Sequence, residues 1–411
     1  MKTCIIVGAG GRGKDCYAPY IKEKGILKIV GVAEPDEQKR NQFKKDYDIA
    51  DDMCFCDYKE LFSKGKLADS VMICTQDKMH LEPTRLAVEC GYHILLEKPI
   101  ATTYEELLEL EKIVDGYDKV FTTGFVLRYT PFIQKIKEII KSGEIGDIIT
   151  MQLNENEGFW HHAHSYVRGP WNNEAKSSPL IVAKSCHDFD LLFYLIDAEC
   201  KKVSSYGSNQ FFKKENAPKD VPLRCTDGCQ YSETCVYNAV DLYTKGQARY
   251  FVHKFECEDT DKAIIEALKT NPYGRCVYRC DNDVCDHQVA SVEFENGVTA
   301  VFTVSAFSRD NTRTIKIMGS KGEVGGCMES GVLVLKRFSD MSEETFHITH
   351  DGTKHCGGDG GLMEHFAKLL NENEKHQDPW LLKAHKAVFS AEKSRQTGRS
   401  IQPYEIGRAH V

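Results

Sequence analysis

Three cysteines fall close together in the stretch CTDGCQYSETC, as Cys225, Cys229 and Cys235, and Cys276 follows further along the chain. Four thiolates are the ligand set of a closed, structural zinc site. Cys280 is a second choice for the fourth ligand, and an iron–sulfur cluster or unligated thiols are alternatives. We expect a structural zinc that holds a long polar insertion together rather than a reaction centre.

A second group with chemical potential is GAGGRG, which supplies Gly8, Gly10 and Gly13 in a G-x-G-x-x-G pattern. The first glycine permits a tight turn, the second lets a pyrophosphate approach the backbone, and the third lets a helix pack on a strand. Glu34 follows roughly 20 residues after Gly13, the spacing of an acid that binds a ribose 2′-hydroxyl. Such a carboxylate repels a 2′-phosphate, so the pattern predicts NAD rather than NADP.

A third group is Glu97-Lys98-Pro99, which comes directly after the apolar run HILL. Ligands of open α/β sheets bind beyond the carboxyl ends of the strands, so an ammonium there can reach a substrate hydroxyl and a nicotinamide together. A surface lysine before a turn-forming proline would have the same sequence, and the tripeptide alone does not separate the two interpretations.

These groups need elements to position them, and the first 125 residues alternate apolar, strand-like runs with amphipathic segments of helical length. The runs are CIIVGAG, KIVGVAE, SVMICT, HILLEKP and VFTTGF. Short apolar runs that end in glycine are typical of buried parallel strands. The alternation predicts an α/β fold with an N-terminal, doubly wound parallel sheet of the Rossmann type over residues 1–125.

The pattern changes after residue 125. An amphipathic helix is expected over 131–147, and period-two alternation follows in DIITMQLNENE, KKVSSYGSN, HQVASVEFENGVTAVFTVSAF, RTIKIMGSKGEVGG and GVLVLKRF. Hairpin turns punctuate these runs, and a last helix is expected before Gly398. We therefore predict a second α/β domain over 126–405 with an open, mostly antiparallel sheet and a cysteine-containing insertion at about 209–286.

The bulk composition limits the classes of partner. The chain has 411 residues, 41% hydrophobic and 28% charged, with a net charge of −8, and it has no basic face that would suit nucleic acid. No apolar run approaches the ~20 residues that cross a bilayer. Seventeen cysteines without a secretion signal indicate reduced thiols and a cytoplasmic protein.

The glycine motif, Glu34, Glu97-Lys98-Pro99 and GFVLRYTP after the next strand together resemble the Gfo/Idh/MocA oxidoreductases. The resemblance extends over nearly the whole chain. It implies nicotinamide-dependent oxidation or reduction of a sugar or polyol hydroxyl, with Lys98 in the active site. It also implies a homodimer or homotetramer that associates through the open sheet. We expect further dinucleotide contacts from Gly11, Arg12, Thr75, His80, Glu97, Lys98 and Arg128.

The stretch PLIVAKSCHDFDLLFYL, at 179–195, is similar to the family's helix that carries Asp-x-x-x-His toward the nicotinamide. The histidine corresponds to His187, which implies a role as proton acceptor. The aspartate position is Ala183, a departure from the family pattern. Lys184 is a candidate to replace the acid by contacting a substrate oxygen, and Asp188 is a candidate to orient His187 and to bind substrate.

The segment FWHHAHSYVRGPW, at 159–171, combines aromatic and hydrogen-bonding side chains, as carbohydrate sites do. We expect a sugar-binding loop, with a metal site on its histidines and a plain surface loop as alternatives. In HCGGDGG, His355 and Asp359 lie in a glycine-rich stretch that could approach a ligand closely. The residues expected to bind substrate are therefore His164, Tyr166, Arg168, Trp171, Asp188 and His355.

Three functions are compatible with this sequence. The first is an NAD-dependent oxidoreductase that oxidises a ring hydroxyl of a sugar or glycoside, with C3 as the first candidate. The second is an NAD-dependent glycosidase that oxidises C3 transiently, eliminates the aglycone, adds water and reduces the ketone again. The third is a non-catalytic NAD-binding or redox-sensing protein. Residues 406–411, IGRAHV, resemble a translated sequencing adapter, and we expect them to be a cloning or assembly artefact rather than part of the fold.

Overall fold

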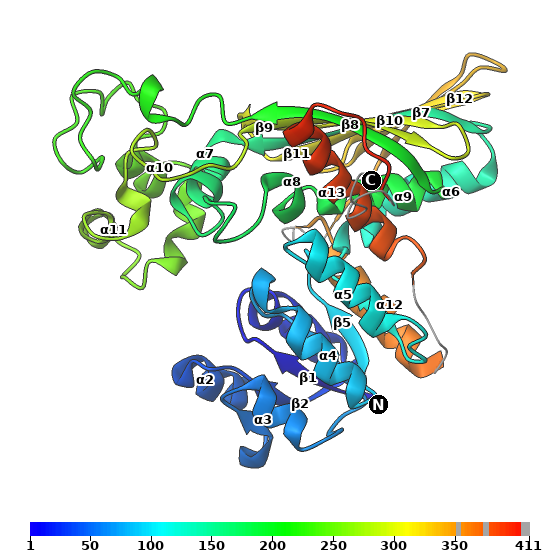
Figure 1. Ribbon diagram of the computed structural model, residues 1–411, viewed down its shortest axis with the longest axis horizontal. Coiled ribbons are helices and arrows are strands. Elements are labelled where there is room, and N and C mark those ends of the chain that lie inside the picture. The colour runs from blue at the N-terminus through cyan, green and yellow to red at the C-terminus, as the bar shows by residue number, and fades with distance from the viewer. Residues whose placement is uncertain (351–354, 373–377, 404–411) are drawn as a thin grey trace, which may run out of the picture.

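The computed structural model describes residues 1–350, 355–372 and 378–403 and confirms the predicted α/β architecture of two sheets. A parallel sheet near the N-terminus lies in one layer, and a larger sheet from the second half of the chain lies in another (Figure 1). Helices fill the space between them. Residues 406–411, interpreted above as an artefact, lie outside the described residues.

The first sheet has the strand order β3-β2-β1-β4-β5-β6, and every pair in it is parallel. Its strands are β1 (Thr3–Val7), β2 (Lys28–Ala33), β3 (Cys54–Phe55), β4 (Ser70–Ile73), β5 (His93–Leu96) and β6 (Phe121–Thr123). Its helices are α1 (Ala18–Lys24), α2 (Glu37–Tyr47), α3 (Tyr58–Ser63), α4 (Leu81–Glu89) and α5 (Tyr104–Val114). The strands β4 and β5 are buried along their whole length because helices cover both faces.

The second sheet has the order β14-β13-β12-β11-β7-β10-β9-β8 and is antiparallel except for the pair of β7 and β10. Its strands are β7 (Ile148–Gly158), β8 (Cys200–Ser208), β9 (His287–Phe294), β10 (Thr299–Ser308), β11 (Thr312–Gly319), β12 (Gly322–Cys327), β13 (Val332–Arg337) and β14 (Glu343–His347). Only β14, polar and largely exposed, had no expected counterpart in the sequence.

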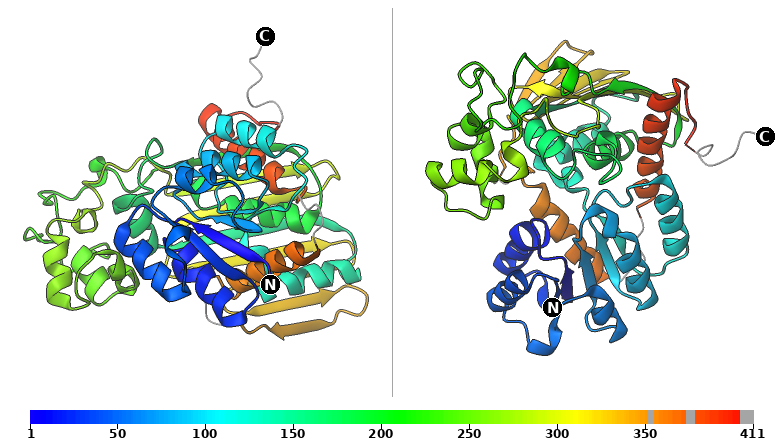
Figure 2. Two further views of the ribbon diagram at one scale, coloured as in Figure 1. Left: turned by 90° about the horizontal axis from the view of Figure 1, so that it is seen from below. Right: turned by 60° about the vertical axis from the view of Figure 1, so that its left-hand side comes forward.

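One face of this sheet is covered and the other is open. The helices on the covered side are α6 (Pro131–Ser142), α8 (Leu180–Ala183), α9 (Cys186–Ile196) and α13 (Leu381–Thr397). Figure 2 shows these helices on the side of the sheet that faces the N-terminal domain. Along β7, Met151 and Leu153 point to that side, whereas Ile149 is exposed on the other. This alternation is the expected one for a sheet buried on one face.

The expected helix over 179–195 is interrupted. α8 ends at Ala183 and α9 begins at Cys186, with Ser185 in a non-helical conformation between them. Ala183 and His187 therefore do not lie on one continuous helix, although the resemblance to the family's helix over 179–195 implied one.

Helix α12 (Gly358–Glu372) belongs to the second half of the chain but packs against the first. Figure 1 shows it beside the N-terminal domain, where it contacts α1. Its glycines make this contact possible, because a Cβ on Gly360 would lie 2.5 Å from the Tyr20 ring and one on Gly361 would lie 2.8 Å from Tyr129. The glycine-rich stretch thus permits close helix packing, and it brings Asp359 to the glycine loop of the first domain.

The polar insertion has small cores of its own. Its helices include α10 (Ala239–Thr244) and α11 (Asp261–Leu268), which project to one side of the second sheet together with α7 (Phe159–His162) (Figure 1). Two buried clusters, separate from the main core, hold these elements together.

Candidate active site

The glycine loop has the geometry that a dinucleotide needs. Gly8 has a φ of +96°, and a Cβ there would lie 2.7 Å from the Cys74 carbonyl oxygen. A Cβ on Gly13 would lie 2.5 Å from the carbonyl oxygen of Gly8, so this position also requires glycine. Gly10 has open space around its Cα, and the neighbouring Gly11 is almost as open. The loop is therefore tight where the backbone turns and open where a pyrophosphate would approach.

Glu34 lies just beyond β2 and faces this loop. Its carboxylate accepts hydrogen bonds from the backbone N–H of Ala9 at 2.8 Å and of Asp36 at 3.1 Å. The acid is buried. It is held beside the glycine turn, where a carboxylate would contact an adenosine ribose.

Thr75 and His80 support the turn at Pro99, on the same edge of the sheet. The two ring nitrogens of His80 contact the carbonyl oxygen of Pro99 at 2.7 Å and that of Thr75 at 3.2 Å. The structure thus brings these residues together with Lys98, and the two His80 contacts fix the backbone of the sheet edge.

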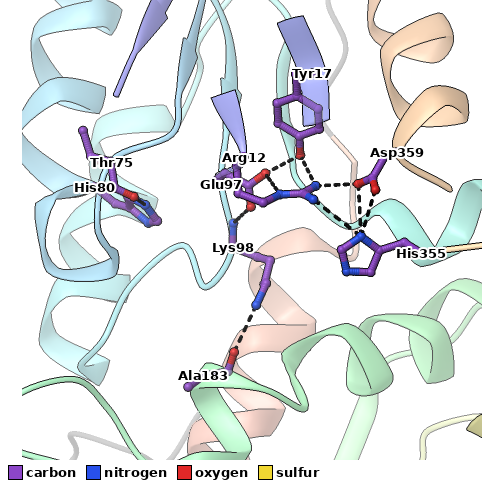
Figure 3. A network of polar contacts seen from close by, with 9 residues as sticks. All are labelled: Arg12, Tyr17, Thr75, His80, Glu97, Lys98, Ala183, His355 and Asp359. Atoms are coloured by element: carbon purple, nitrogen blue, oxygen red, sulfur yellow. Dashed lines mark hydrogen bonds and ion pairs between the residues drawn. The ribbon is translucent and has the colours of Figure 1, made fainter. Parts of the chain in front are cut away.

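A network centred on Arg12 joins the glycine loop to α12 (Figure 3). The Arg12 guanidinium donates to Glu97 at 2.9 Å and to Asp359 and the Tyr17 hydroxyl, each at 2.7 Å. Tyr17 also donates to Glu97. Burial raises the pKa of Glu97, but Arg12 and the Tyr17 hydroxyl outweigh it and hold the pKa below its ordinary value. Glu97 is therefore ionised, and Arg12 links the two halves of the chain.

Lys98 reaches the second domain. Its ammonium donates to the carbonyl oxygen of Ala183, at the end of α8, at 3.2 Å (Figure 3). The residue at the position of the missing family aspartate thus contacts Lys98 through its backbone rather than its side chain.

His187 lies close to Lys98 but has no acidic partner. Its Nδ1 is buried and makes no hydrogen bond to any described group. Burial, followed by the charges of Lys98 and His355, lowers its pKa well below the ordinary value. Asp188 contacts Arg313 of β11 at 2.9 Å instead of His187, so the structure does not support the expectation that Asp188 orients His187.

Lys184 belongs to a buried ionic cluster that the motifs did not reveal. Its ammonium lies 3.2 Å from Glu155 and 3.9 Å from Glu157, and Arg313 pairs with Glu155 as well. Burial lowers the pKa of Lys184, but the two carboxylates outweigh it and raise the pKa. A signal for this cluster existed in the sequence, since Glu155 and Glu157 share the inward face of β7 with Leu153.

His355 stands on the other side of His187. The centres of the two rings are 6.0 Å apart. The Nδ1 atom of His355 lies 3.0 Å from Asp359 Oδ2, and Arg12 Nη1 lies 3.5 Å away. Lys98, His187, Lys184 and His355 are therefore gathered around the junction of the two domains.

The histidine-rich segment is mostly core, which corrects its interpretation as a sugar-binding loop. His164 is stacked between Phe251 and Tyr273, with ring centres 3.9 and 4.5 Å away, and its Nδ1 contacts the Tyr243 hydroxyl at 2.8 Å. Burial lowers the pKa of His164 to about 2. A neutral imidazole packed between two rings is not available to a substrate.

Three further residues of this segment also face the interior. Arg168 is fully buried and donates to the carbonyl oxygens of Arg275 and Tyr237 at 2.7 and 2.6 Å. Tyr166 is buried against His162, and Trp171 donates to Asp77 of the first domain at 3.0 Å. The Arg168 contacts hold the insertion in place, and the expectation that these three side chains bind substrate finds no support.

Arg128 is not placed with the dinucleotide residues. Its guanidinium pairs with Asp190 of α9, at 2.6 Å for Nε, and with Asp378. Both carboxylates belong to the second half of the chain. Arg128 is thus a buried link between helices, and sequence reasoning could not tell this from a phosphate contact.

The cysteines also depart from expectation. Cys225, Cys229, Cys235 and Cys276 do line one cavity of about 250 Å³ in the insertion. However, within the described part of the chain no three His, Cys, Asp or Glu side chains are arranged to hold a metal ion. The predicted structural zinc is therefore not supported. None of the seventeen cysteines, all of which lie within the described residues, forms a disulfide bond.

Among the described residues, none of the helices combines the length and apolar composition needed to cross a lipid bilayer.

Comparison with family models matches residues 2–125 to "Oxidoreductase family, NAD-binding Rossmann fold" and residues 133–325 to "GFO/IDH/MocA C-terminal domain". The two matches together cover most of the chain and meet near the boundary between its two sheets.

Curated relatives agree with these matches. YteT of Bacillus subtilis strain 168, whose name says only that it is an oxidoreductase, is 25% identical over 89% of this chain and 88% of its own. The 2,7-anhydro-N-acetylneuraminate hydratase of Mediterraneibacter gnavus is 25% identical over 51% of this chain and 54% of its own. The D-glucoside 3-dehydrogenase of Escherichia coli K12 is 27% identical over 35% of this chain and 40% of its own.

Among solved structures, a levoglucosan dehydrogenase in complex with NADH and levoglucosan matches with a TM-score of 0.70 and 16% identity, covering 98% of this chain and 99% of that chain. At this identity the match establishes the fold alone.

Proposed function

The chain belongs to the Gfo/Idh/MocA family and is an NAD-dependent oxidoreductase; from that premise, we propose that it oxidises a ring hydroxyl of a sugar or glycoside, with C3 as the first candidate. The names of its relatives support a sugar substrate, and the D-glucoside 3-dehydrogenase supports C3. We further propose that residues 1–125 bind the cofactor and that residues 126–405, with the insertion at about 209–286, bind substrate.

One observation carries the proposal. The Lys98 ammonium extends from the carboxyl edge of the cofactor sheet to Ala183 of the second domain, where His187 and His355 also lie. A cation and two imidazoles thus meet beside the expected position of a nicotinamide. This combination suits an alcohol that loses a proton while a hydride leaves its carbon.

The cofactor site fits NAD. Gly8, Gly10, Gly11 and Gly13 would hold the pyrophosphate and Glu34 the ribose, and the bound nicotinamide would supply the hydride acceptor. In our proposal Thr75 and His80 shape the nicotinamide side, and Glu97 with Arg12 fixes the backbone that presents Lys98.

Lys98 then stabilises the oxygen on which negative charge develops. Its ammonium donates a hydrogen bond to the Ala183 carbonyl and can exchange that acceptor for a substrate hydroxyl. We propose that Lys184, which is held between Glu155 and Glu157, binds a neighbouring hydroxyl. An imidazole accepts the proton.

The redox-neutral glycosidase is the second candidate, because it needs the same oxidation at C3 followed by elimination and hydration. A hydratase among the relatives favours this route. A 4-nitrophenyl glycoside separates the two. Release of nitrophenol without net NADH supports the glycosidase, and stoichiometric NADH supports the dehydrogenase.

The test of the main proposal uses a panel of aldoses, methyl glycosides and anhydrosugars with NAD, followed by the absorbance of NADH. We expect turnover with at least one sugar and a loss of about 10²–10³-fold in kcat for Lys98→Met, with NADH still bound. NADH binding without turnover of any sugar would instead favour the non-catalytic, redox-sensing alternative.

We also propose a homodimer or homotetramer formed through the open face of the second sheet. Apolar side chains on that face are exposed, including Tyr206, Val301 and Phe307. A cytoplasmic location is likewise proposed, since none of the seventeen cysteines forms a disulfide bond. Light scattering of the purified protein tests the oligomer, and Tyr206→Lys with Val301→Lys should dissociate it.

A further inference from the structure

We propose that His355, held by Asp359, accepts the proton of the substrate hydroxyl, a role that the family resemblance implied for His187. This inference rests on the proposed function in one respect, since it takes the reaction to be oxidation of an alcohol. It identifies the carboxylate that takes over from the family aspartate missing at Ala183.

The contacts of His355 define its tautomer. Its Nδ1 lies 3.0 and 3.2 Å from the two carboxylate oxygens of Asp359, whereas Arg12 Nη1 is 3.5 Å away. The shorter contacts identify Nδ1 as a donor to Asp359, so Nε2 carries the lone pair. A carboxylate behind an imidazole fixes its orientation and stabilises the imidazolium that forms.

The second ring nitrogen is available. In Figure 3 it points away from Asp359 and Arg12, and no hydrogen bond to a described residue engages it. About 28% of the His355 side chain is exposed. The base can therefore receive a proton from substrate and return it to solvent.

His187 lacks each of these properties. It is buried, its Nδ1 has no partner among the described groups, and the neighbouring Asp188 pairs with Arg313. Positive charge on His187 would face Lys98 without a compensating carboxylate, which is unfavourable in a buried site. Because its ring lies 6.0 Å from that of His355, it can bind the same carbinol as a hydrogen-bonding partner.

Asp359 is itself held by Arg12, whose Nη2 donates to it at 2.7 Å. Arg12 belongs to the glycine loop, and α12 packs on the first domain through Gly360, which lies against the Tyr20 ring. Elements of both halves therefore fix the pair, as a precise catalytic geometry requires.

The proposed oxidation breaks two bonds of the carbinol, O–H and C–H. The hydroxyl O–H bond breaks and its proton moves to Nε2 of His355, while the O–H electron pair becomes the second bond of the new carbonyl. The C–H bond breaks with its electron pair, which NAD⁺, held by the glycine loop, would accept as hydride. Lys98 stabilises the oxygen during the change, and Asp359 keeps its negative charge beside the imidazolium.

The first experiment needs no sugar. NMR of protein labelled with ¹⁵N-histidine, with His355→Gln to assign the resonance, reports the tautomer and the pKa. We expect the proton on Nδ1 and, in Asp359→Asn, a pKa about 1 unit lower or more, because the stabilising negative charge is lost. A proton on Nε2, or a pKa that does not respond to Asp359→Asn, overturns the proposal.

The second experiment uses whichever sugar of the panel is turned over. We expect His355→Gln to lower kcat by about 10²–10⁴-fold, and His187→Gln to act mainly on KM. As a positioning residue, Asp359 is tested by the acid limb of the pH–rate profile, which should move in Asp359→Asn. Full kcat in His355→Gln, with the large loss in His187→Gln, contradicts the assignment. If wild-type protein oxidises no sugar, the proposed function fails, while the titration still decides whether the pair exists.

Discussion

The glycine loop at Gly8–Gly13 and the histidine-rich segment at 159–171 both have sequences that suggest a ligand site. The structure separates them. The loop leaves open space above Gly10, whereas His164 of the segment is enclosed between Phe251 and Tyr273. The glycine loop therefore has room for a ligand, whereas the space around His164 is occupied by side chains of the protein itself.

The reason for the difference lies in what each residue type encodes. A glycine pattern describes the backbone, and the backbone of a strand–turn–helix is fixed by a few neighbouring residues. A histidine takes its role from what surrounds it, and His164 is surrounded by residues 79 to 109 positions away. Local patterns are therefore a safer guide to the loop than to the segment.

Gly13→Ala should have the largest effect among the variants that test this comparison of the glycine loop with the histidine-rich segment. A Cβ there would overlap the Gly8 carbonyl, so the turn must open and NAD binding should be lost together with some stability. Gly10→Ala is the matched control, because its Cβ meets nothing in the protein. It should weaken NAD binding while leaving the thermal midpoint unchanged. Calorimetry measures the thermal midpoint, and NADH fluorescence measures the affinity for the dinucleotide. The same loss of affinity and of thermal midpoint in the two variants would refute this account of the loop.

On the other side of the comparison, His164→Ala should act on stability alone. Removing a ring packed between two others leaves a cavity and an unpaired Tyr243 hydroxyl, at a cost of about 3 kcal/mol in the free energy of unfolding. The matched control is His253→Ala, on the surface of the same insertion. Urea unfolding and kcat/KM of the folded fraction provide the measurement. A large loss of kcat/KM with normal stability in His164→Ala would instead indicate that the histidine-rich segment belongs to the substrate site.

Much of the fold could be predicted, because both domains repeat simple patterns. The apolar runs gave the parallel strands β1, β2, β4 and β5, and period-two alternation gave most of the second sheet. The break between α8 and α9 could not be foreseen, since Lys184 and Ser185 are compatible with a helix. The position of α12 against the first domain also depends on packing that no local pattern describes.

The candidate site likewise contains residues that could be predicted from motifs and residues that could not. Lys98, Glu34 and the glycines follow from motifs on one sheet edge. The pairing of His355 with Asp359 and Arg12 joins residues more than 340 positions apart, so it appears only in three dimensions. Arg168 and Arg128 show the converse, because a buried arginine in a structural contact has the same sequence as one that binds a ligand.

A smaller effect is expected at the ribose end of the loop. Glu34→Gln keeps an acceptor for the Ala9 N–H but removes the charge that repels a 2′-phosphate. The ratio of NADP to NAD affinity should rise about tenfold, or about 1.4 kcal/mol. Glu37→Gln, an exposed acid in the first turn of α2, is the control and should leave the ratio unchanged. Titration with both reduced cofactors gives the ratio; no change for Glu34→Gln would place the ribose elsewhere.

A last effect concerns the pH dependence of stability and again separates the two regions. Burial lowers the pKa of His164 to about 2, far below its ordinary value, so the unfolded chain binds a proton there that the folded chain does not. Stability is complete above about pH 6.5 and falls with acid, by up to about 1.4 kcal/mol per pH unit for this residue. His93 and His385, with pKa values of about 4, add to the slope until that pH. His164→Phe should flatten the dependence between about pH 6.5 and 5 in urea unfolding, whereas His253→Phe should not. A slope in His164→Phe equal to that of the wild type would contradict this prediction. It would mean that His164 takes up its proton in the folded protein, although two rings enclose the imidazole.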